Sequence, residues 1–427
     1  MKRKLCLGLG GVRLSSYTVQ RVGRYGVQQF RPISSGGINS EVEAMKEELI
    51  AWRRDFHKHP ELAFEEFRTS GIVAEKLESW GIEVDRVAGT GVVGSLTGSK
   101  STTLQGGSEY TSIGLRADMD ALPIKEENDF PHKSLIEGKM HACGHDGHTT
   151  MLLGAAKYLA SNRESFSGKV NFIFQPAEES QGGGREMVED GLFSKYPCDE
   201  IYALHNWPMI EKGTIAVIDG PVMAAVDEFK VVIEGVGGHA AYPQLTVDPI
   251  VIGSHIVTSL QSVISRQSDP VDAAVVSVTQ FHAGSSYNVI PSSAIIRGTM
   301  RSFKEETREN LKSRLVSIAE STSKAFDATA KVTIYPGYPA TVNSSKSAIH
   351  AAKVAEELVG ESNLLRQEAP SMGAEDFSYM LREVPGCYVW VGSESTNMLH
   401  HPKYDFDDAI LPRGVQYLAN LATSRLQ

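Results

Sequence analysis

Three apolar runs that each lead into acidic or histidine residues place the strongest constraint on the fold of this chain. They are IGLRADMD at residues 113–120, VNFIFQPAEE at 170–179 and IYALHNWP at 201–208. Short, nearly continuous apolar runs of this kind are typical of strands buried on both faces of a sheet. In parallel α/β sheets, ligands and catalytic groups collect beyond the carboxyl ends of the strands. We therefore predict an α/β fold in which Asp, Glu and His side chains meet at one edge of a sheet flanked by helices.

The pattern of apolar and polar residues changes at about Ala225 and changes back after Tyr338. Between them the segments EFKVVIEG, DPIVIGSHIVTSLQSVIS, AAVVSVTQF, AIIRGTMRSF, ETRENLKSRLVSIAEST and AKVTIYP read as strand, helix, strand, strand, helix and strand. This is the order of a split βαβ, ferredoxin-like α+β domain. Because 427 residues exceed what one core usually supports, we predict that residues 225–338 form an inserted domain. Residues 41–224 and 339–427 would form the first domain.

Residues 1–40 differ from the rest of the chain in their charged residues, which are all basic. Their basic residues are Lys2, Arg3, Lys4, Arg13, Arg21, Arg24 and Arg31, and no acidic residue precedes Glu41. An Arg-rich, serine-containing and acid-free segment predicts a transit peptide for mitochondria, whereas the apolar run at residues 5–12 is short for a secretory signal. The alternative is a basic tail on a cytoplasmic protein. Removal of the seven positive charges would change the formal net charge from −10 to −17.

Charge and cysteine content narrow the classes of function. The net charge of −10 argues against a nucleic-acid partner, and without a run of about 18 apolar residues we expect no membrane span. A small-molecule substrate is then the expected ligand. Outside the leader, Cys143, Cys198 and Cys387 form an odd set without disulfide-like spacing, which indicates a reducing compartment. Cys198 and Cys387 have no histidine neighbours and are expected to be small buried residues.

The segment HACGHDGH at residues 141–148 contains three histidines, a cysteine and an aspartate within eight residues. A thiolate at Cys143 and an imidazole at His145 are good ligands for zinc-like or late transition metals. Gly144 between them permits a tight turn, so both side chains can point at one site. This segment therefore indicates a metal site.

This segment has three other polar residues, His141, Asp146 and His148, whose expected roles differ. Asp146 is placed to cap a helix that begins near Gly147, and we expect that role for it. His141 and His148 are expected either to be structural or to support the ligands. The segment alone does not decide between these two roles.

Glu178 and Glu179 directly follow the apolar run FIFQP. Adjacent carboxylates repel one another, and a nearby dication offsets that cost. Because neighbouring side chains diverge in an extended backbone, one carboxylate can bind metal while the other faces a water molecule. Most such pairs are solvated surface residues, but the position after a buried strand favours a site.

His205 ends another apolar run, and His400 and His401 precede a proline. Taken singly, the first resembles a hydrogen-bonded core histidine and the other two resemble a polar turn. Taken together with the cysteine and the glutamates, they give the mixed sulfur, nitrogen and oxygen ligands of a site for two metals. Such a site keeps open positions for water and substrate.

Nine motifs, in order from about residue 43 onward, resemble one class of metallopeptidases. They are HPELAFEE, GLRADMDALPI, HACGHDGHTTMLLGAA, FQPAEE, ALHNWP, GGHAAYPQLTVDPI, NVIPSSAIIRGTMRSF, GAEDFSYM and LHHPKYDFDD. The chain is similar to the aminoacylase and carboxypeptidase G class, in its amidohydrolase branch of hippurate hydrolases, auxin-conjugate hydrolases and N-acetyl amino-acid deacetylases. The resemblance implies a dimetal exopeptidase-like first domain that hydrolyses the amide bond of N-acyl amino acids. A dipeptidase or carboxypeptidase is the alternative, but the HACGH form of the metal loop favours the amidohydrolase branch.

The resemblance also implies roles for individual residues. Two divalent ions, zinc or manganese with nickel or cobalt as alternatives, would be bound by Cys143, His145, Glu179, His205 and His400. Glu178 would be the general base, and Asp118 would orient a ligand histidine. A homologue that only binds its ligand would have lost one of these residues, and all of them are present.

Further implied roles lie mainly in the inserted domain, which would be a lid that forms a homodimer. His239, Asn288 and Arg301 would contact the substrate or the oxyanion that forms on it. Judged from its own surroundings, His239 after GVGG would be an ordinary loop histidine. Arg185 stands where the branch has a small residue, so we expect it to change the shape of the substrate pocket.

Overall fold

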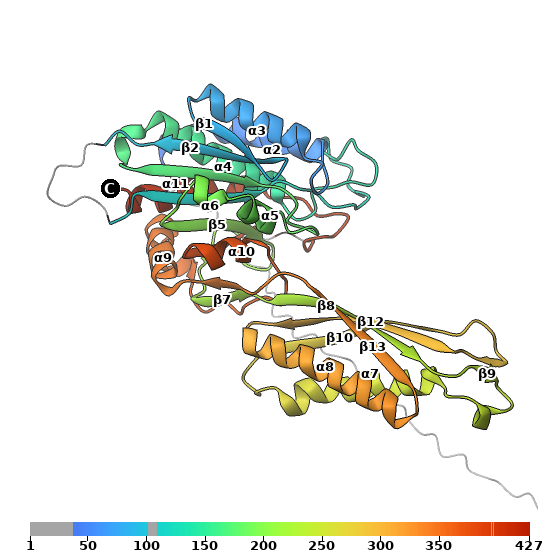
Figure 1. Cartoon of the computed structure of the whole chain (residues 1–427). Coiled ribbons are helices and arrows are strands. Elements are labelled where there is room, and N and C mark those ends of the chain that lie inside the picture. Colours follow the sequence, from blue (N-terminus) through green and yellow to red (C-terminus); the bar gives the residue numbers. More distant parts are fainter. Residues whose placement is uncertain (1–36, 101–108, 394, 396) are drawn as a thin grey trace, which may run out of the picture. The chain divides into compact units, whose positions relative to one another are not determined.

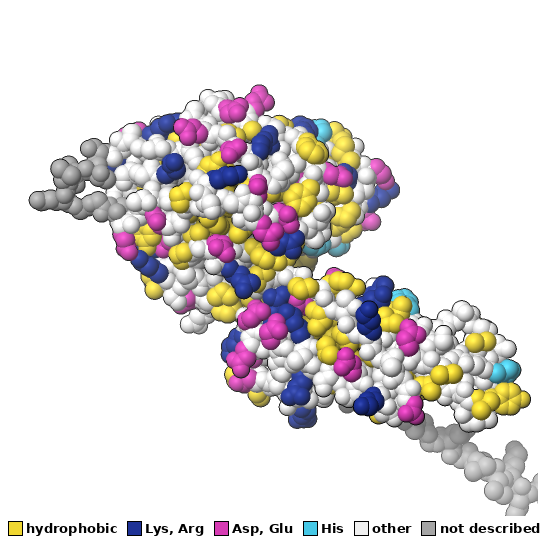
Figure 2. Space-filling view, viewed as in Figure 1, with side chains coloured by type: hydrophobic (Ala, Val, Ile, Leu, Met, Phe, Trp, Pro, Cys, Tyr) yellow, Lys and Arg dark blue, Asp and Glu magenta, His cyan; other side chains and the backbone are white. Residues whose placement is uncertain are grey.

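The computed structural model describes residues 37–100, 109–393, 395 and 397–427 (Figure 1). All seven basic residues of the predicted leader lie outside the described residues. Within the described part, none of the helices combines the length and the apolar character needed to cross a membrane. Acidic and basic side chains are interspersed on the face seen in Figure 2.

An eight-stranded mixed sheet forms the centre of the first domain. Its strands, in spatial order, are β1 (Glu83–Val87), β2 (Gly91–Thr97), β4 (Lys169–Gln175), β3 (Ser112–Asp118), β5 (Glu200–Trp207), β16 (Gly386–Gly392), β6 (Ile215–Ala216) and β15 (Leu364–Leu365). The central strands β4, β3, β5 and β16 run parallel, and β1, β2 and β6 pair antiparallel with their neighbours on the central side. The prediction of an α/β fold is confirmed, and the three apolar runs are the neighbouring strands β3, β4 and β5.

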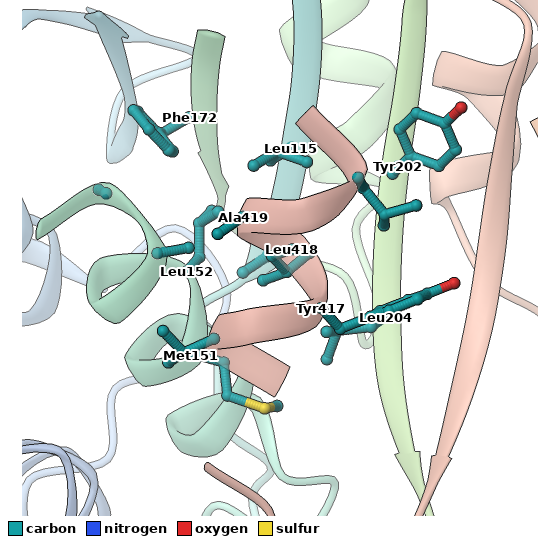
Figure 3. Close-up of a cluster of buried hydrophobic side chains, with 14 of the residues drawn as sticks. Leu115, Met151, Leu152, Phe172, Tyr202, Leu204, Tyr417, Leu418 and Ala419 are labelled. Atoms are coloured by element: carbon teal, nitrogen blue, oxygen red, sulfur yellow. The ribbon is translucent and has the colours of Figure 1, made fainter. Parts of the chain in front are cut away.

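Helices cover both faces of this sheet, which explains why its central strands β3, β4 and β5 are buried and mainly apolar. One face packs against α2 (Lys46–Lys58), α3 (Phe67–Ser79), α4 (His145–Ser161), α9 (Ser345–Val359) and α11 (Leu411–Arg425). The other face packs against α5 (Gly183–Glu189), α6 (Leu192–Lys195) and α10 (Phe377–Glu383). Figure 3 shows part of the first core, with Leu115, Phe172, Tyr202 and Leu204 of the strands beside Met151 and Leu152 of α4 and Tyr417, Leu418 and Ala419 of α11.

A second, antiparallel sheet is formed by residues 225–336. Its spatial order is β10 (Ala274–Ala283), β12 (Ser293–Ser302), β8 (Ala225–Glu234) and β13 (Thr329–Pro336). One face packs on α7 (Pro249–Gln267) and α8 (Glu305–Ala325) and has its own hydrophobic core. Alternate residues of β8 are buried, as expected for a sheet with one covered face. The strand order and the two helices are those of a split βαβ domain.

Short elements complete the described chain. The strands are β7 (Gly220–Met223), which pairs with β14 (Thr341–Asn343), and β9 (Gly238–His239), which pairs with β11 (Val289–Ile290). The helix α1 spans Ser40–Ala44, and single 3-10 turns occur at Arg163–Ser165, Pro243–Leu245, Glu361–Asn363 and Asp408–Ile410. The pair β7 and β14 lies directly before and after the second sheet in the sequence.

Candidate active site

The polar residues predicted at the strand ends come together at one edge of the first sheet. Asp118 is the last residue of β3, Glu178 and Glu179 follow β4, and His205 lies near the end of β5. The parallel pairing of β3 with β4 places Asp118 opposite Gln175, so these strands end at the same level. The strand-end rule therefore predicted this edge correctly.

Cys143, in the loop before α4, and His145, the first residue of α4, reach the same edge. That helix begins at His145, and Gly144 before it has the positive φ of 95° that side chains rarely adopt. A Cβ atom on Gly144 would also lie 2.1 Å from Oδ1 of Asn206. Only glycine fits this turn, and the turn directs both side chains into the site.

Six of the predicted residues supply closely spaced ligand atoms. The groups Cys143, His145 and His205, then Cys143, Glu179 and His400, then His145, Glu178 and Glu179 each have atoms within 4.8 Å of one another. The Sγ atom of Cys143 is 3.4 Å from Nε2 of His205, and Oε1 of Glu179 is 3.2 Å from Nε2 of His400. Because the groups share members, they form one continuous cluster of sulfur, nitrogen and oxygen donors.

His400, rather than His401, belongs to this cluster. The backbone of His400 has a φ of 65°, unusual for a residue other than glycine, and its amide donates to the carbonyl of Ala142. His401 is exposed, and its Nδ1 accepts from the amide of Lys403. The turn at residue 400 thus ties the end of the chain to the loop that carries Cys143.

Hydrogen bonds leave selected atoms of the cluster unpaired. Nδ1 of His145 lies 2.9 Å from the carbonyl oxygen of Asp120, and Nδ1 of His205 lies 2.6 Å from that of Asn206. A carbonyl oxygen only accepts, so each Nδ1 carries a proton, and in a neutral ring Nε2 would then be the atom that can bind a metal ion. Within the described residues, Nε2 of His145 and Oε1 of Glu179 are buried and have no hydrogen-bond partner. Buried polar atoms without a hydrogen-bond partner are rare in proteins, so a further bound group, the occupant of this cluster, is expected between them.

The electrostatics of the cluster favour a cation as that occupant. Burial, together with the nearby Glu179 and Glu178, raises the pKa of the Cys143 thiol well above its usual range. Burial and the carboxylates of Glu375 and Glu179 also raise the pKa of Glu178. Burial lowers the pKa of His145, but Asp118 and other carboxylates more than compensate, and its pKa rises to about 10. Divalent metal ions would offset this excess of acidic groups, and these donors are those that such ions bind.

The carboxylate that orients His145 is Asp120, a residue not singled out from the sequence. Its Oδ1 lies 3.2 Å from Nδ1 of His145, and its two oxygens accept from the amides of Glu178 and Glu179 at 3.0 Å each. Asp118, the predicted orienting residue, instead bonds Nδ1 of His148 at 2.7 Å. The sequence ADMD offered both aspartates, but only the path of the chain beyond β3 distinguishes them.

Of the remaining polar residues of the HACGHDGH segment, His148 and Asp146 bond to other side chains, whereas His141 does not. His148 uses both ring nitrogens, with Asp118 and Asn206, so it has no free ligand atom. Gly144, not Asp146, is the N-cap of α4. Asp146 lies inside the first turn, where Oδ1 accepts from the amide of Gly147 at 3.0 Å and Oδ2 contacts Nδ1 of His57 at 2.8 Å. His141 is buried, and neither of its ring nitrogens has a hydrogen-bond partner among the residues that the structure describes.

A second charged cluster lies beside Glu178. It includes Glu375 and Asp376 of the GAEDF motif, which pair with Arg116. The fully buried Arg116 pairs with Asp118 at 2.7 Å, Glu375 at 2.9 Å and Asp376 at 3.1 Å. The amide of Asp376 in turn lies 3.4 Å from Oε1 of Glu178. This network was not predicted from the sequence, since Arg116 lies about 260 residues from Asp376.

The cluster opens into a cavity of about 690 Å³. Its lining includes Cys143, Glu178, Glu179, His205 and His400 of the cluster, Arg301 of β12, Arg185, and the aromatic residues Trp207, Tyr335, Tyr338, Tyr379 and Tyr388. Arg301 donates to the carbonyl of Met372 at 2.6 Å and forms no salt bridge with the described residues, and burial lowers its pKa. Arg185 pairs with Glu186 at 2.9 Å. The cavity therefore combines a donor cluster, one unpaired cation and apolar walls.

His239 and Asn288 do not line this cavity. His239 lies in β9, which pairs with β11 just beyond Asn288, and both side chains are exposed. The amide of Ala240 donates to the carbonyl of Asn288, so the two predicted residues lie close to each other. The structure brings them together, but at a place apart from the donor cluster of their own chain.

Comparison with known proteins agrees with this site. The profile of a family described as peptidase family M20/M25/M40 matches residues 114–424. A hippurate hydrolase of Campylobacter jejuni is 39% identical over 388 residues, covering 91% of this chain and 99% of that protein. An N-acetylcysteine deacetylase of Bacillus subtilis is 38% identical over 387 residues, covering 90% and 98%. The structure of a dinuclear metal binding peptidase from Bacillus subtilis aligns with a TM-score of 0.77 and 36% identity, covering 90% and 99%. The chain belongs to peptidase family M20/M25/M40.

Proposed function

We propose that this protein is a metal-dependent amidohydrolase that cleaves the amide bond of N-acyl amino acids. The products are a carboxylic acid and a free amino acid. The observation that carries the proposal is the single cavity that joins the donor cluster, the buried Glu178 and the unpaired Arg301. Relatives matched over nearly their whole length act as a hippurate hydrolase and an N-acetylcysteine deacetylase, and the substrates of both are N-acyl amino acids.

The residues that would hold two divalent ions are Cys143, His145, Glu179, His205 and His400. When bound, such ions supply Lewis acidity, which makes water more acidic and polarises the amide carbonyl. The thiol of Cys143 favours a softer ion such as zinc, whereas the imidazoles and the carboxylate also accept manganese, nickel or cobalt.

Glu178 is the group that moves the proton. Its carboxylate lies within 4.8 Å of ligand atoms of His145 and Glu179, where it can accept a proton from water. It then delivers this proton to the leaving amine, since one positioned group can act first as base and then as acid. Glu179 faces the histidines instead and serves as a ligand.

Arg301 and the aromatic walls suit the two ends of the substrate. A guanidinium with no carboxylate partner can pair with the α-carboxylate of the amino acid. Trp207 and Tyr388 offer apolar surface for an acyl group such as acetyl or benzoyl. This arrangement binds a substrate that has an anion at one end and an apolar group at the other.

A substrate panel tests the proposal directly. Metal-depleted protein would receive zinc, manganese, nickel or cobalt separately, and release of the amino acid would be measured from N-acetyl amino acids, N-benzoyl amino acids and dipeptides. We expect turnover of the acylated amino acids only after metal is added. Hydrolysis of dipeptides alone would favour the peptidase alternative, and activity without bound metal would contradict the proposal.

We also propose that residues 1–40 direct the protein to mitochondria, because they contain seven basic residues and no acidic one. A fluorescent reporter fused to residues 1–40 should co-localise with a mitochondrial marker. A variant with Arg13, Arg21, Arg24 and Arg31 changed to glutamine is the matched control. A diffuse distribution of the first fusion would favour the cytoplasmic alternative.

A further inference from the structure

Tyr338 lies in the connection that returns from the second sheet to the first domain, between β13 and β14. The amide of Val226, at the start of β8, donates to the carbonyl of Tyr338 at 3.0 Å, and the amide of Gly337 donates to the carbonyl of Val226 at 3.1 Å. A Cβ atom on Gly337 would lie 2.6 Å from that carbonyl oxygen, so glycine permits the close approach. The outgoing and returning connections are therefore paired with each other at Tyr338.

The side chain of Tyr338 reaches the segment that carries the two glutamates. Its hydroxyl donates to the carbonyl of Glu178 at 2.6 Å and accepts from the amide of Gly182 at 3.1 Å. This segment is a turn closed by the amide of Gly183 and the carbonyl of Ala177 at 3.0 Å. Ala177 and Gly182 at its two ends both have left-handed backbones, with φ of 55° and 68°. One hydroxyl thus bonds backbone groups near the start and near the end of this turn.

The polar backbone groups of this turn depend on side chains because Glu178 lies outside the strand ladder. The carboxylate of Asp120 accepts from the amides of Glu178 and Glu179, and the carboxylate of Glu66 accepts from the amide of Ala177 at 2.9 Å. Tyr338 supplies the matching donor for the carbonyl of Glu178. Without that hydroxyl, nothing else that the structure describes bonds this carbonyl.

From these contacts we propose that Tyr338 is a positioning residue for Glu178, and that it ties the catalytic base to the connection with the inserted domain. The inference rests on the proposed role of Glu178 as general base. Tyr338 itself need not touch the reacting atoms, since it acts by fixing the peptide from which the Glu178 carboxylate extends. A small displacement of a catalytic group is costly, because about 1 Å can lower a rate by roughly 10²-fold.

The test is the variant Tyr338→Phe, which keeps the ring and removes only the hydroxyl. We expect kcat on the best substrate of the panel to fall by about 10- to 100-fold, with KM changed by less than about 3-fold. Metal content should stay equal to that of the unaltered protein. Hydrogen–deuterium exchange, which needs no substrate, should become faster in a peptide that spans residues 177–183.

The matched control is Tyr417→Phe, which also removes a buried hydroxyl bonded to a backbone carbonyl. Tyr417 donates to the carbonyl of Ala351 at 2.9 Å and does not line the cavity. This variant should lose thermal stability but keep kcat and the exchange rate of residues 177–183. If Tyr338→Phe behaves like Tyr417→Phe in both measurements, the positioning role is overturned. Failure of the unaltered protein to hydrolyse any panel substrate would instead contradict the proposed function, while the exchange measurement would still decide the role of Tyr338.

Discussion

Glu178 and Glu179 are adjacent in the sequence, but their carboxylates have different neighbours. Oε1 of Glu179 lies 3.9 Å from Nε2 of His145 and 3.2 Å from Nε2 of His400. Oε1 of Glu178 lies instead at the amide of Asp376, close to other carboxylates. The turn that carries both residues thus gives their carboxylates different neighbours, which supports the two different roles proposed for them.

Replacing each glutamate by glutamine should separate the two roles. Glu178→Gln should retain both metal ions and bind substrate, but kcat should fall by about 10²- to 10⁴-fold because an amide cannot accept the proton. Glu179→Gln removes a negative ligand, so metal content and melting temperature should fall together. Elemental analysis and calorimetry of both variants would decide. Loss of metal from Glu178→Gln with retention in Glu179→Gln would mean that the roles are reversed.

Asp120 should affect metal binding without being a ligand. In Asp120→Asn, one acceptor oxygen becomes a donor that faces an amide, so the Glu178–Glu179 turn and the ring of His145 lose support. We expect metal affinity to fall by about 10- to 100-fold, as for other residues that orient a ligand.

Asp199→Asn is the matched control for this variant, because Asp199 also accepts from two backbone amides, those of Thr111 and Ser112. It should keep its metal affinity and lose little free energy of unfolding, because Asp199 is exposed and accepts both bonds on one oxygen that asparagine also offers. Equal metal affinities for the two variants in a chelator competition would contradict the orienting role of Asp120.

Sequence reasoning found the donor-bearing residues because their chemistry is visible in a short window, as in HACGHD and FQPAEE. It did not find Asp120 or Tyr338, because their importance lies in bonds to a backbone whose path is set by tertiary structure. A tyrosine 160 residues from its partner gives no local signal. The family resemblance, rather than local sequence reasoning, placed His239 and Asn288 at the site, and neither residue lines the cavity of its own chain.

At the level of elements, the strands beside the site could be predicted from their apolar runs, but the order of their neighbours in the sheet could not. Strands β3, β4 and β5 are buried on both faces, so each appears as an apolar run. The two-residue strands β6 and β15 have no such pattern, and the position of β16 between β5 and β6 depends on a long crossover. The start of α4 was misplaced because a left-handed glycine, rather than Asp146, precedes the helix.

The helices α2 and α4 are joined by an ion pair that should depend on pH. Nδ1 of His57, in the last turn of α2, lies 2.8 Å from Asp146 in the first turn of α4, an arrangement that also suits both helix dipoles. Burial lowers the pKa of His57, but the hydrogen bonds to Asp146 and Glu126 raise it to about 9. Because this exceeds the ordinary value of 6.5, protonated His57 stabilises the fold fully below about pH 6.5, and the contribution is lost as the pH rises through 9.

Comparison with His57→Gln should reveal this contribution. The unaltered protein should exceed the variant in free energy of unfolding at about pH 6, and the difference should shrink by up to about 3 kcal/mol at about pH 10. Denaturant unfolding at both values measures it. His350→Gln is the control, because burial lowers the pKa of His350 to about 4 and this histidine is neutral throughout the range. A difference for His57→Gln that does not change with pH would contradict the pairing of a charged His57 with Asp146.

At the scale of the whole molecule, His239 lies away from the donor cluster of its own chain. Its imidazole is exposed in β9 and lies outside the cavity of its own chain. The β9–β11 pair that carries it belongs to the proposed inserted domain, for which the sequence resemblance implies a role in dimer formation. We propose that the protein forms a homodimer in which His239 of each chain completes the cavity of the partner subunit and stabilises the oxyanion.

Mixing two inactive variants tests this arrangement. His239→Ala and Glu178→Gln should each be nearly inactive when purified alone, with losses in kcat of roughly 10²-fold or more. In dimers formed by co-expression, one of the two cavities contains an intact Glu178 from its own chain and an intact His239 from the partner subunit. Random pairing makes about half of the dimers mixed, so activity should recover to about a quarter of that of the unaltered protein. If His239 acted within its own chain, every cavity in the mixture would lack one of the two groups. Activity that stays at the level of the separate variants would therefore rule out the shared site, and a monomeric mass in light scattering would rule out the dimer itself.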